Sequence, residues 1–253
     1  MDDSPIFNPQ FDGNPFFWQG SSTGILLVHG FTATVQEVRP LAQILHQKGY
    51  TVAGPLLPGH YTHPDDLNKA HWQDWVSAVR EMYQRISSAC QTVIVGGEST
   101  GGLLSLYLAS EHPEIAAVLL YAPALRLTLS PAMVLLLHIL APFKSYSPKP
   151  AQDPDSLWQG YRVNPLKGTI QLLRLQKQVY PVLPKIHQPL LIVQGRLDPT
   201  VHPTVPDTIS SQVNSTVKEI YWMEQSAHCV ILDKEREQVG QTTLKFLDKV
   251  LQP

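Results

Sequence analysis

Short apolar runs alternate with longer amphipathic segments along most of the chain, and this alternation restricts the possible folds more than any other feature. Runs of this kind are typical of strands buried on both faces, and we expect them at residues 25–28, 50–53, 92–95, 116–120, 190–193 and 217–222. Apolar residues spaced three and four positions apart predict helices over residues 35–48, 72–86, 101–110 and 234–251. Strands joined by helices are parallel, so the sequence predicts an α/β fold with a doubly wound, mostly parallel sheet.

Two stretches depart from the alternation. Aromatic residues among Asn, Gly and Pro in residues 1–20 indicate an arm or short edge strand packed on the body. Residues 123–187 are rich in proline and contain no convincing strand, which predicts a helical cap inserted between two parts of one core, 1–122 and 188–253. The apolar run 133–140 inside this segment is by itself typical of a buried core helix, and the alternative is a lid over an apolar pocket. It is shorter than the roughly 20 residues that cross a bilayer, so no stable membrane insertion is expected.

Composition excludes several classes of function. The chain has 253 residues, 43% of them hydrophobic and 16% charged, which is enough for a sizeable core. With 19 basic and 21 acidic residues it has no basic excess to neutralise phosphates, so nucleic acid is not an expected partner. Only Cys90 and Cys229 are present, and the first residues lack the basic and apolar regions of a secretory signal. We therefore expect a cytoplasmic location without disulfides.

The strongest local motif is Gly97-Glu98-Ser99-Thr100-Gly101, a G-x-S-x-G sequence. It follows the predicted strand 92–95 and precedes the predicted helix 101–110, which is the strand–turn–helix setting that the motif requires. In such a turn, small neighbours let the serine oxygen project clear of the sheet, and the helix N-terminus favours negative charge. Ser99 is therefore the predicted nucleophile.

A serine nucleophile needs a base, and the base needs an orienting acid. His228 follows the last predicted strand, and Asp198 follows the strand before it. Catalytic groups of such sheets belong on loops at the carboxyl ends of strands, and the order Ser99, Asp198, His228 is the one found in this architecture. Weaker alternatives are His202 for the base and Asp207 or Asp233 for the acid.

The transition state of acyl transfer also needs hydrogen-bond donors for an oxyanion. The backbone N–H of Thr100, directly after the nucleophile, is well placed for this role. The second donor is expected from the loop His29-Gly30-Phe31-Thr32, where Gly30 allows a close approach and the Phe31 N–H can point at the site.

Several pieces of sequence occur in a familiar order and spacing: His29-Gly30-Phe31-Thr32, Leu57-Pro58-Gly59-His60, Asp74-Trp75, the 97–101 motif, Gly195-Arg196-Leu197-Asp198 and Ser226-Ala227-His228. Together they resemble the α/β-hydrolase superfamily, and within it the small bacterial carboxylesterases and monoacylglycerol lipases. The resemblance implies hydrolysis of short- to medium-chain acyl esters, including monoacylglycerols, through an acyl-enzyme and without a metal or organic cofactor. It also implies that the cap shapes the acyl pocket, for which Phe31, Met133, Leu136 and Trp158 are the predicted substrate-binding residues.

Some questions stay open at this level. A thioesterase, a C–C bond hydrolase or an acyltransferase would use the same triad, because these enzymes differ in the leaving group. A non-enzymatic binding protein would usually have lost part of the triad. The partner is expected to be a small acyl ester, and the chain a monomer or weak homodimer.

Unlike most of the group, this chain has Glu98 before the serine, where it can alter the titration of the site or point away from it. Cys229 is interpreted as a small buried residue, and His60 as either a brace for the site or a simple loop contact.

Overall fold

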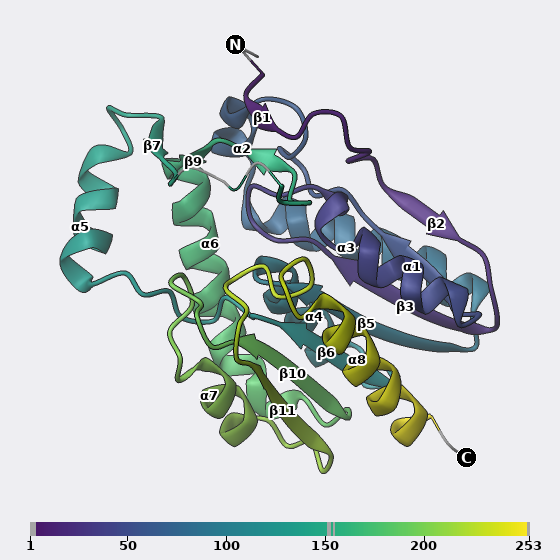
Figure 1. The fold of residues 1–253 in the computed structure, drawn as a ribbon. Coiled ribbons are helices and arrows are strands. Elements are labelled where there is room, and N and C mark those ends of the chain that lie inside the picture. The colour runs from purple at the N-terminus through teal and green to yellow at the C-terminus, as the bar shows by residue number, and fades with distance from the viewer. Residues whose placement is uncertain (1–3, 151–152, 154, 252–253) are drawn as a thin grey trace.

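A seven-stranded sheet forms the centre of the computed structural model, which describes residues 4–150, 153 and 155–251 (Figure 1). The strand order is β11-β10-β6-β5-β3-β4-β2. The strands are β2 (Phe16–Trp18), β3 (Thr23–Val28), β4 (Thr51–Gly54), β5 (Thr92–Glu98), β6 (Ala117–Tyr121), β10 (Leu190–Gly195) and β11 (Lys218–Met223). Only the edge strand β2 runs antiparallel to its neighbour, and the other pairs are parallel. The predicted α/β fold with a mostly parallel, doubly wound sheet is confirmed.

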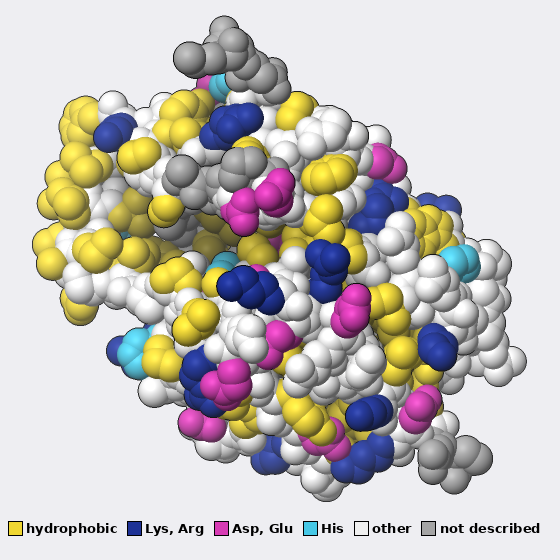
Figure 2. All heavy atoms as spheres, in the orientation of Figure 1, with side chains coloured by type: hydrophobic (Ala, Val, Ile, Leu, Met, Phe, Trp, Pro, Cys, Tyr) yellow, Lys and Arg dark blue, Asp and Glu magenta, His cyan; other side chains and the backbone are white. Residues whose placement is uncertain are grey.

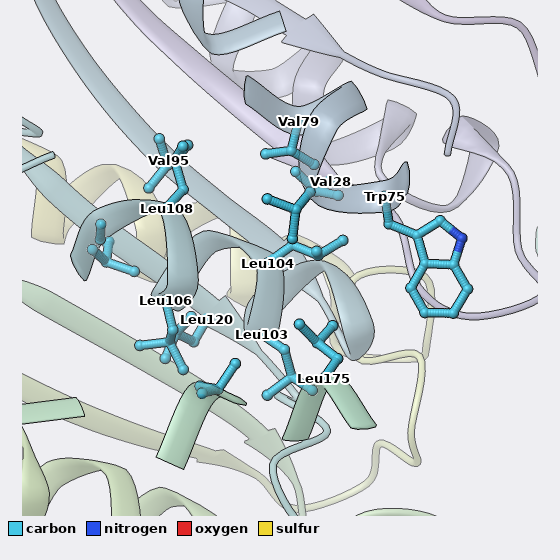
Figure 3. Packing of buried hydrophobic residues seen from close by; sticks show 14 of the residues in the cluster. Val28, Trp75, Val79, Val95, Leu103, Leu104, Leu106, Leu108, Leu120 and Leu175 are labelled. Atoms are coloured by element: carbon cyan, nitrogen blue, oxygen red, sulfur yellow. The ribbon is translucent and has the colours of Figure 1, made fainter. Parts of the chain in front are cut away.

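Helices cover both faces of this sheet because successive side chains of a strand point to opposite sides. Leu26 and Val28 of β3 belong to a core shared with α3 (Trp72–Ala89) and α4 (Thr100–Glu111). Ile25 and Leu27 of the same strand belong to the opposite core, with α1 (Arg39–Gln47) and α8 (Arg236–Val250). Figure 3 shows the leucines of α4 between the sheet and Leu175 of the helix α6 (Leu166–Val179). No helix within the described parts of the chain is long and apolar enough to cross a membrane.

Other short helices refine the predicted pattern. The helix expected at residues 35–48 divides into a 3-10 turn, η1 (Val35–Glu37), and α1, whose first turn contains Pro40. Two helices lie outside the helix ranges that the sequence predicts: α2 (Pro64–Lys69) and α7 (Val205–Gln212). Both are short and have a proline in the first turn, where a missing N–H costs nothing.

The segment between β6 and β10 contains small strands as well as helices, so the expectation of no strand there is wrong. It comprises α5 (Pro131–Leu140), β7 (Tyr146–Pro148), β8 (Gly160–Tyr161), β9 (Val163–Pro165), α6 and the 3-10 helix η2 (Tyr180–Lys185). β7 pairs with β9, and β8 pairs with β1 (Ile6–Phe7) of the N-terminal arm. These strands have only two or three residues, too few for an alternating pattern to mark them in the sequence.

The interpretation of residues 133–140 as a buried core helix is also wrong. No residue of α5 is buried, and Leu135 keeps 63% of its surface exposed. Figure 2 shows apolar side chains gathered over the part of the molecule where Figure 1 draws α5. His138 is likewise exposed, with Nδ1 2.8 Å from the carbonyl oxygen of Val134. The helix packs on α6 from one side, so its apolar composition does not bury it.

Candidate active site

Ser99 occupies a strained turn between β5 and α4. Its φ of 54° and ψ of −111° lie in a region that non-glycine residues seldom adopt. Its N–H donates to the carbonyl oxygen of Tyr121 at 2.8 Å on the adjoining strand β6. A Cβ atom on either Gly97 or Gly101 would collide with the backbone carbonyl oxygen of Val28. The two glycines of the motif therefore let the start of α4 lie directly against β3.

The structure brings the three predicted side chains together from loops after three parallel strands. His228 Nε2 lies 3.0 Å from Ser99 Oγ, and His228 Nδ1 lies 2.8 Å from Asp198 Oδ2. Asp198 follows β10 and His228 follows β11. Neither Asp207 nor Asp233 contacts the His228 ring in the described part of the chain: Asp207 is exposed on α7, and Asp233 Oδ2 accepts from the Ala227 N–H.

Asp198 has a set of donors that favour its ionised form. Oδ1 accepts from the backbone N–H groups of Thr200 at 2.7 Å and Val201 at 3.1 Å, and Oδ2 accepts from Gln194 Nε2 at 2.7 Å as well as from His228. Burial alone would raise the pKa of this carboxyl, but the His228 and backbone donors outweigh it and hold the pKa below its usual value. An ionised Asp198 accepts a hydrogen bond from the Nδ1–H of His228, so Nε2 carries no proton and is free to accept the one on Ser99 Oγ.

The loop after β3 lies beside Ser99. A Cβ atom on Gly30 would come within 3.2 Å of Ser99 Cβ. The next residue, Phe31, has a backbone N–H with no acceptor among the described residues, and its ring lies 6.1 Å from that of Trp75. Thr32, with a φ of 65°, accepts a hydrogen bond at its carbonyl oxygen from the Tyr161 N–H of β8 at 2.8 Å. The inserted segment is thus attached directly to this loop.

The predicted substrate-binding residues lie in different surroundings. Met133 and Leu136 are about half exposed on α5. Trp158 is buried, with its ring stacked near that of Phe7, and its indole N–H donates to Glu37 Oε1 at 3.2 Å. A cavity of about 220 Å³ between α5 and α6 is lined by neighbouring residues such as Val134. Contact of Met133, Leu136 or Trp158 with a substrate stays a prediction.

Several polar residues near Ser99 were not singled out from the sequence. Glu37 and Gln194 are buried, and Lys149 Nζ donates to Thr32 Oγ1. No sequence pattern distinguishes these three residues from ordinary surface residues. Glu98 points into the interior rather than toward solvent. His60 is buried with Nδ1 3.1 Å from the Leu57 carbonyl oxygen, and its ring lies 4.9 Å from that of His29 and 6.3 Å from that of Phe31, so it makes the loop contact and also packs against the loop beside Ser99.

Neither a reactive thiol nor a metal-binding cluster is found beside the triad among the described residues. Cys229 is half-buried, with Sγ 3.7 Å from Glu37 Oε1. Within the described ranges, no group of three or more His, Cys, Asp or Glu side chains is arranged to hold a metal ion.

The parallel sheet, the strained serine turn and the side chains at the strand ends define the class of protein. Residues 20–163 match the family model described as "Serine aminopeptidase, S33". A relative with more than 30% identity also covers nearly the whole chain. The chain belongs to the α/β-hydrolase family.

The relatives define the class more narrowly. A protein named thermostable monoacylglycerol lipase, from Bacillus sp. (strain H-257), is 35% identical over 235 residues, which are 93% of this chain and 94% of that lipase. A carboxylesterase of Bacillus subtilis (strain 168) is 28% identical over 93% of this chain and 96% of its own. A solved structure described with the metagenome-derived lipolytic enzymes LipS and LipT has a TM-score of 0.87 at 31% identity, covering 94% of this chain and 98% of that one. The protein is a carboxylic ester hydrolase of the lipase and esterase type.

Proposed function

We propose that the protein hydrolyses short- to medium-chain acyl esters, monoacylglycerols among them, with Ser99 as nucleophile, His228 as base and Asp198 as orienting acid. The observation that carries this proposal is the hydrogen-bonded series from Asp198 Oδ2 through both imidazole nitrogens to Ser99 Oγ, at 2.8 and 3.0 Å. The substrate class is supported by the names of the two Bacillus relatives.

In the first half of the reaction, His228 Nε2 removes the proton of Ser99 Oγ as this oxygen attacks the ester carbonyl. Asp198 holds the Nδ1 proton and stabilises the imidazolium that forms. The N–H groups of Phe31 and Thr100 donate to the oxyanion of the tetrahedral intermediate. His228 then protonates the departing alcohol, which leaves an acyl group on Ser99.

In the second half, His228 removes a proton from water, which attacks the acyl carbonyl and releases the acid. The inserted segment, residues 123–187, acts as a cap on the core formed by 1–122 and 188–253. The apolar surface of α5 supports a cap that meets acyl chains, since exposed apolar patches are common at lipid and ligand sites.

Turnover of p-nitrophenyl butyrate, octanoate and palmitate, and of monooctanoylglycerol, tests the proposal. Ser99→Ala is expected to lower kcat by about 10⁴-fold or more, as the loss of the nucleophile does in other triads. Ser110→Ala, at the far end of helix α4, is the matched control and is expected to retain the parent activity, because among the described residues its hydroxyl bonds only the Tyr107 carbonyl oxygen. Equal turnover by the parent and Ser99→Ala would exclude the mechanism. Cleavage of an amino acid p-nitroanilide in preference to the esters would instead favour peptidase chemistry.

A further inference from the structure

Two glutamate side chains are enclosed beneath the proposed triad, and the mechanism above uses neither of them. Glu37 of η1 is 2% exposed, and Glu98 at the end of β5 is fully buried. An ionised carboxylate in such a place is costly unless donors surround it. The contacts of the two residues therefore indicate what each one does.

Glu37 is surrounded by donors from three separate segments. Its Oε2 accepts from the Gly30 N–H at 2.5 Å, and its Oε1 accepts from Trp158 Nε1 at 3.2 Å. The thiol of Cys229 lies 3.7 Å from Oε1. These residues belong to the loop that carries Phe31, to the inserted segment, and to the loop that carries the base. A group that meets only donors is an acceptor with both oxygens, which describes an ionised carboxylate.

The contact with Gly30 acts on the amide predicted to hold the oxyanion. Gly30 is fixed on both sides: its N–H donates to Glu37, and its carbonyl oxygen accepts from His29 Nδ1 at 2.9 Å. His29 Nε2 in turn accepts from the Leu57 N–H at 3.1 Å. Burial lowers the pKa of His29 to about 4, so the ring is neutral and keeps these two roles. The next amide along the chain is that of Phe31, and its direction follows from that of Gly30.

Glu98 has the opposite surroundings. Its Oε2 accepts from the Ile231 N–H at 3.3 Å, while Oε1 has no hydrogen-bond partner in the described structure. Burial, then the charge of Glu37 and that of Asp198, raise the pKa of Glu98 well above its usual value. The phenol of Tyr121 on β6 also lies close to it, and burial raises the pKa of this phenol. A fully buried carboxyl with one oxygen unpartnered and two negative neighbours favours the neutral acid.

The remaining charged groups around Glu37 agree with this division. Burial leaves the pKa of Glu37 above its usual value, and the Gly30 amide and the charge of His228 limit this rise; its ionised form follows from the donors around both oxygens. Lys149 faces it from the inserted segment, above the Trp158 ring, and burial lowers the pKa of this amine to about 8. The thiol of Cys229 has a pKa raised well above its usual value, first by burial and then by Glu37. The thiol is neutral, and Lys149 is the ammonium group that faces Glu37 among the described residues.

We propose that Glu37 is a positioning residue for ester hydrolysis, whose carboxylate holds the Phe31 loop, Trp158 and the His228 loop together, and that Glu98 must stay neutral for this arrangement to persist. The proposal rests on the proposed function, because positioning matters only if Phe31 and His228 take part in catalysis. It concerns the orientation of donors that act in the transition state, and so it affects kcat rather than KM.

Identical substitutions at the two sites form a matched test. Glu37→Gln places an NH₂ group against at least one of the donors, which turns the Phe31 loop or Trp158 away. The variant is therefore expected to lower kcat about 10- to 100-fold, with KM within about twofold. Glu98→Gln replaces a neutral acid by a neutral amide and is expected to keep kcat within about twofold at pH 7. Both are measured with p-nitrophenyl butyrate, with thermal unfolding as the check on folding. Equal losses in the two variants, or a change confined to KM, would contradict the proposal.

A second measurement does not depend on Glu37→Gln being folded. Between the pKa of Glu98 in the unfolded chain and its raised pKa in the fold, the native state keeps a proton that the unfolded state has lost, so stability falls as pH rises. Above the pH range in which ordinary carboxyls titrate, the parent is expected to lose stability relative to Glu98→Gln, while the folded enzyme keeps Glu98 protonated and its kcat unchanged. Parallel stability curves for the two proteins would overturn the proposal. Since stability is measured without turnover, this result is separate from any failure of Ser99→Ala to lose activity.

Discussion

α4 and α5 have similar compositions and opposite surroundings. Both are rich in Leu and nearly free of charge, yet most residues of α4 are buried and no residue of α5 is. α4 follows the central strand β5 and lies between the sheet, α3 and α6, whereas α5 belongs to the inserted segment and packs on α6 (Figure 1). The position of a helix in the topology, more than its composition, therefore decides whether it is buried.

The difference also separates stability from function. An apolar helix enclosed by the core contributes to the free energy of folding, while an exposed one gains little from folding and adds apolar surface. α4 holds Ser99 at its N-terminus against a rigid sheet. α5 presents an exposed apolar surface on the inserted segment, which agrees with the proposed acyl substrates. Substitutions in the two helices are expected to have effects of different kinds.

The largest effect on folding is expected from Leu106→Ala in α4. Leu106 is fully buried in the core that α4 shares with the sheet, so the variant leaves a cavity and should lower the free energy of unfolding by about 2–5 kcal/mol. Urea denaturation followed by circular dichroism measures this loss. A change below about 1 kcal/mol would mean that α4 is less enclosed than the contrast with α5 requires.

Much of the core could be predicted from the sequence because its strands and helices carry clear periodic patterns. The apolar run of β3 predicts a buried strand, and the G-x-S-x-G sequence predicts a tight strand-to-helix turn. At Gly97 and Gly101 a side chain would collide with the backbone of β3, so only glycine fits there. The inserted segment could not be predicted in the same way. β8 is only two residues long and takes its partner, β1, from the other end of the chain, so no local pattern marks it.

The site divides in the same manner. The loops after β5, β10 and β11 bring Ser99, Asp198 and His228 together, and their positions follow from the rule that such groups lie at strand ends. Glu37 could not be found in this way. Its partners come from three separate segments, two of them more than 100 residues away. It lies among valines in the sequence, where nothing distinguishes a buried acceptor from a surface glutamate.

A smaller effect is expected where the inserted segment joins the core. Asn68 of α2 accepts with Oδ1 from the N–H groups of Lys167 at 2.9 Å and Gly168 at 3.3 Å, in the first turn of α6. Asn68→Ala leaves these donors without the cap and should cost about 1 kcal/mol. Asn68→Asp is the control for the acceptor, because it keeps the oxygen and adds a charge that suits a helix N-terminus, while both variants lose the bond from Nδ2 to the Ser145 carbonyl oxygen at 3.0 Å. Thermal unfolding of both variants measures this loss of stability, and proteolysis of the inserted segment serves as a local probe. Equal destabilisation by Ala and Asp would show that the acceptor at the N-terminus of α6 is unimportant.

The smallest effect on stability is expected on α5 itself, where Leu135→Ser and Leu136→Ser form a pair. The side chains are 63% and 52% exposed, so each variant should remain within about 0.5 kcal/mol of the parent in urea denaturation. Leu136 is a predicted substrate contact and Leu135 is not. The KM for p-nitrophenyl octanoate should therefore rise about three- to tenfold for Leu136→Ser only, with p-nitrophenyl acetate unaffected in both. Equal KM changes in the two variants would show that Leu136 does not contact the acyl chain. A stability loss above about 2 kcal/mol in either variant would mean that α5 is covered in solution, so that it would no longer differ from α4 in burial.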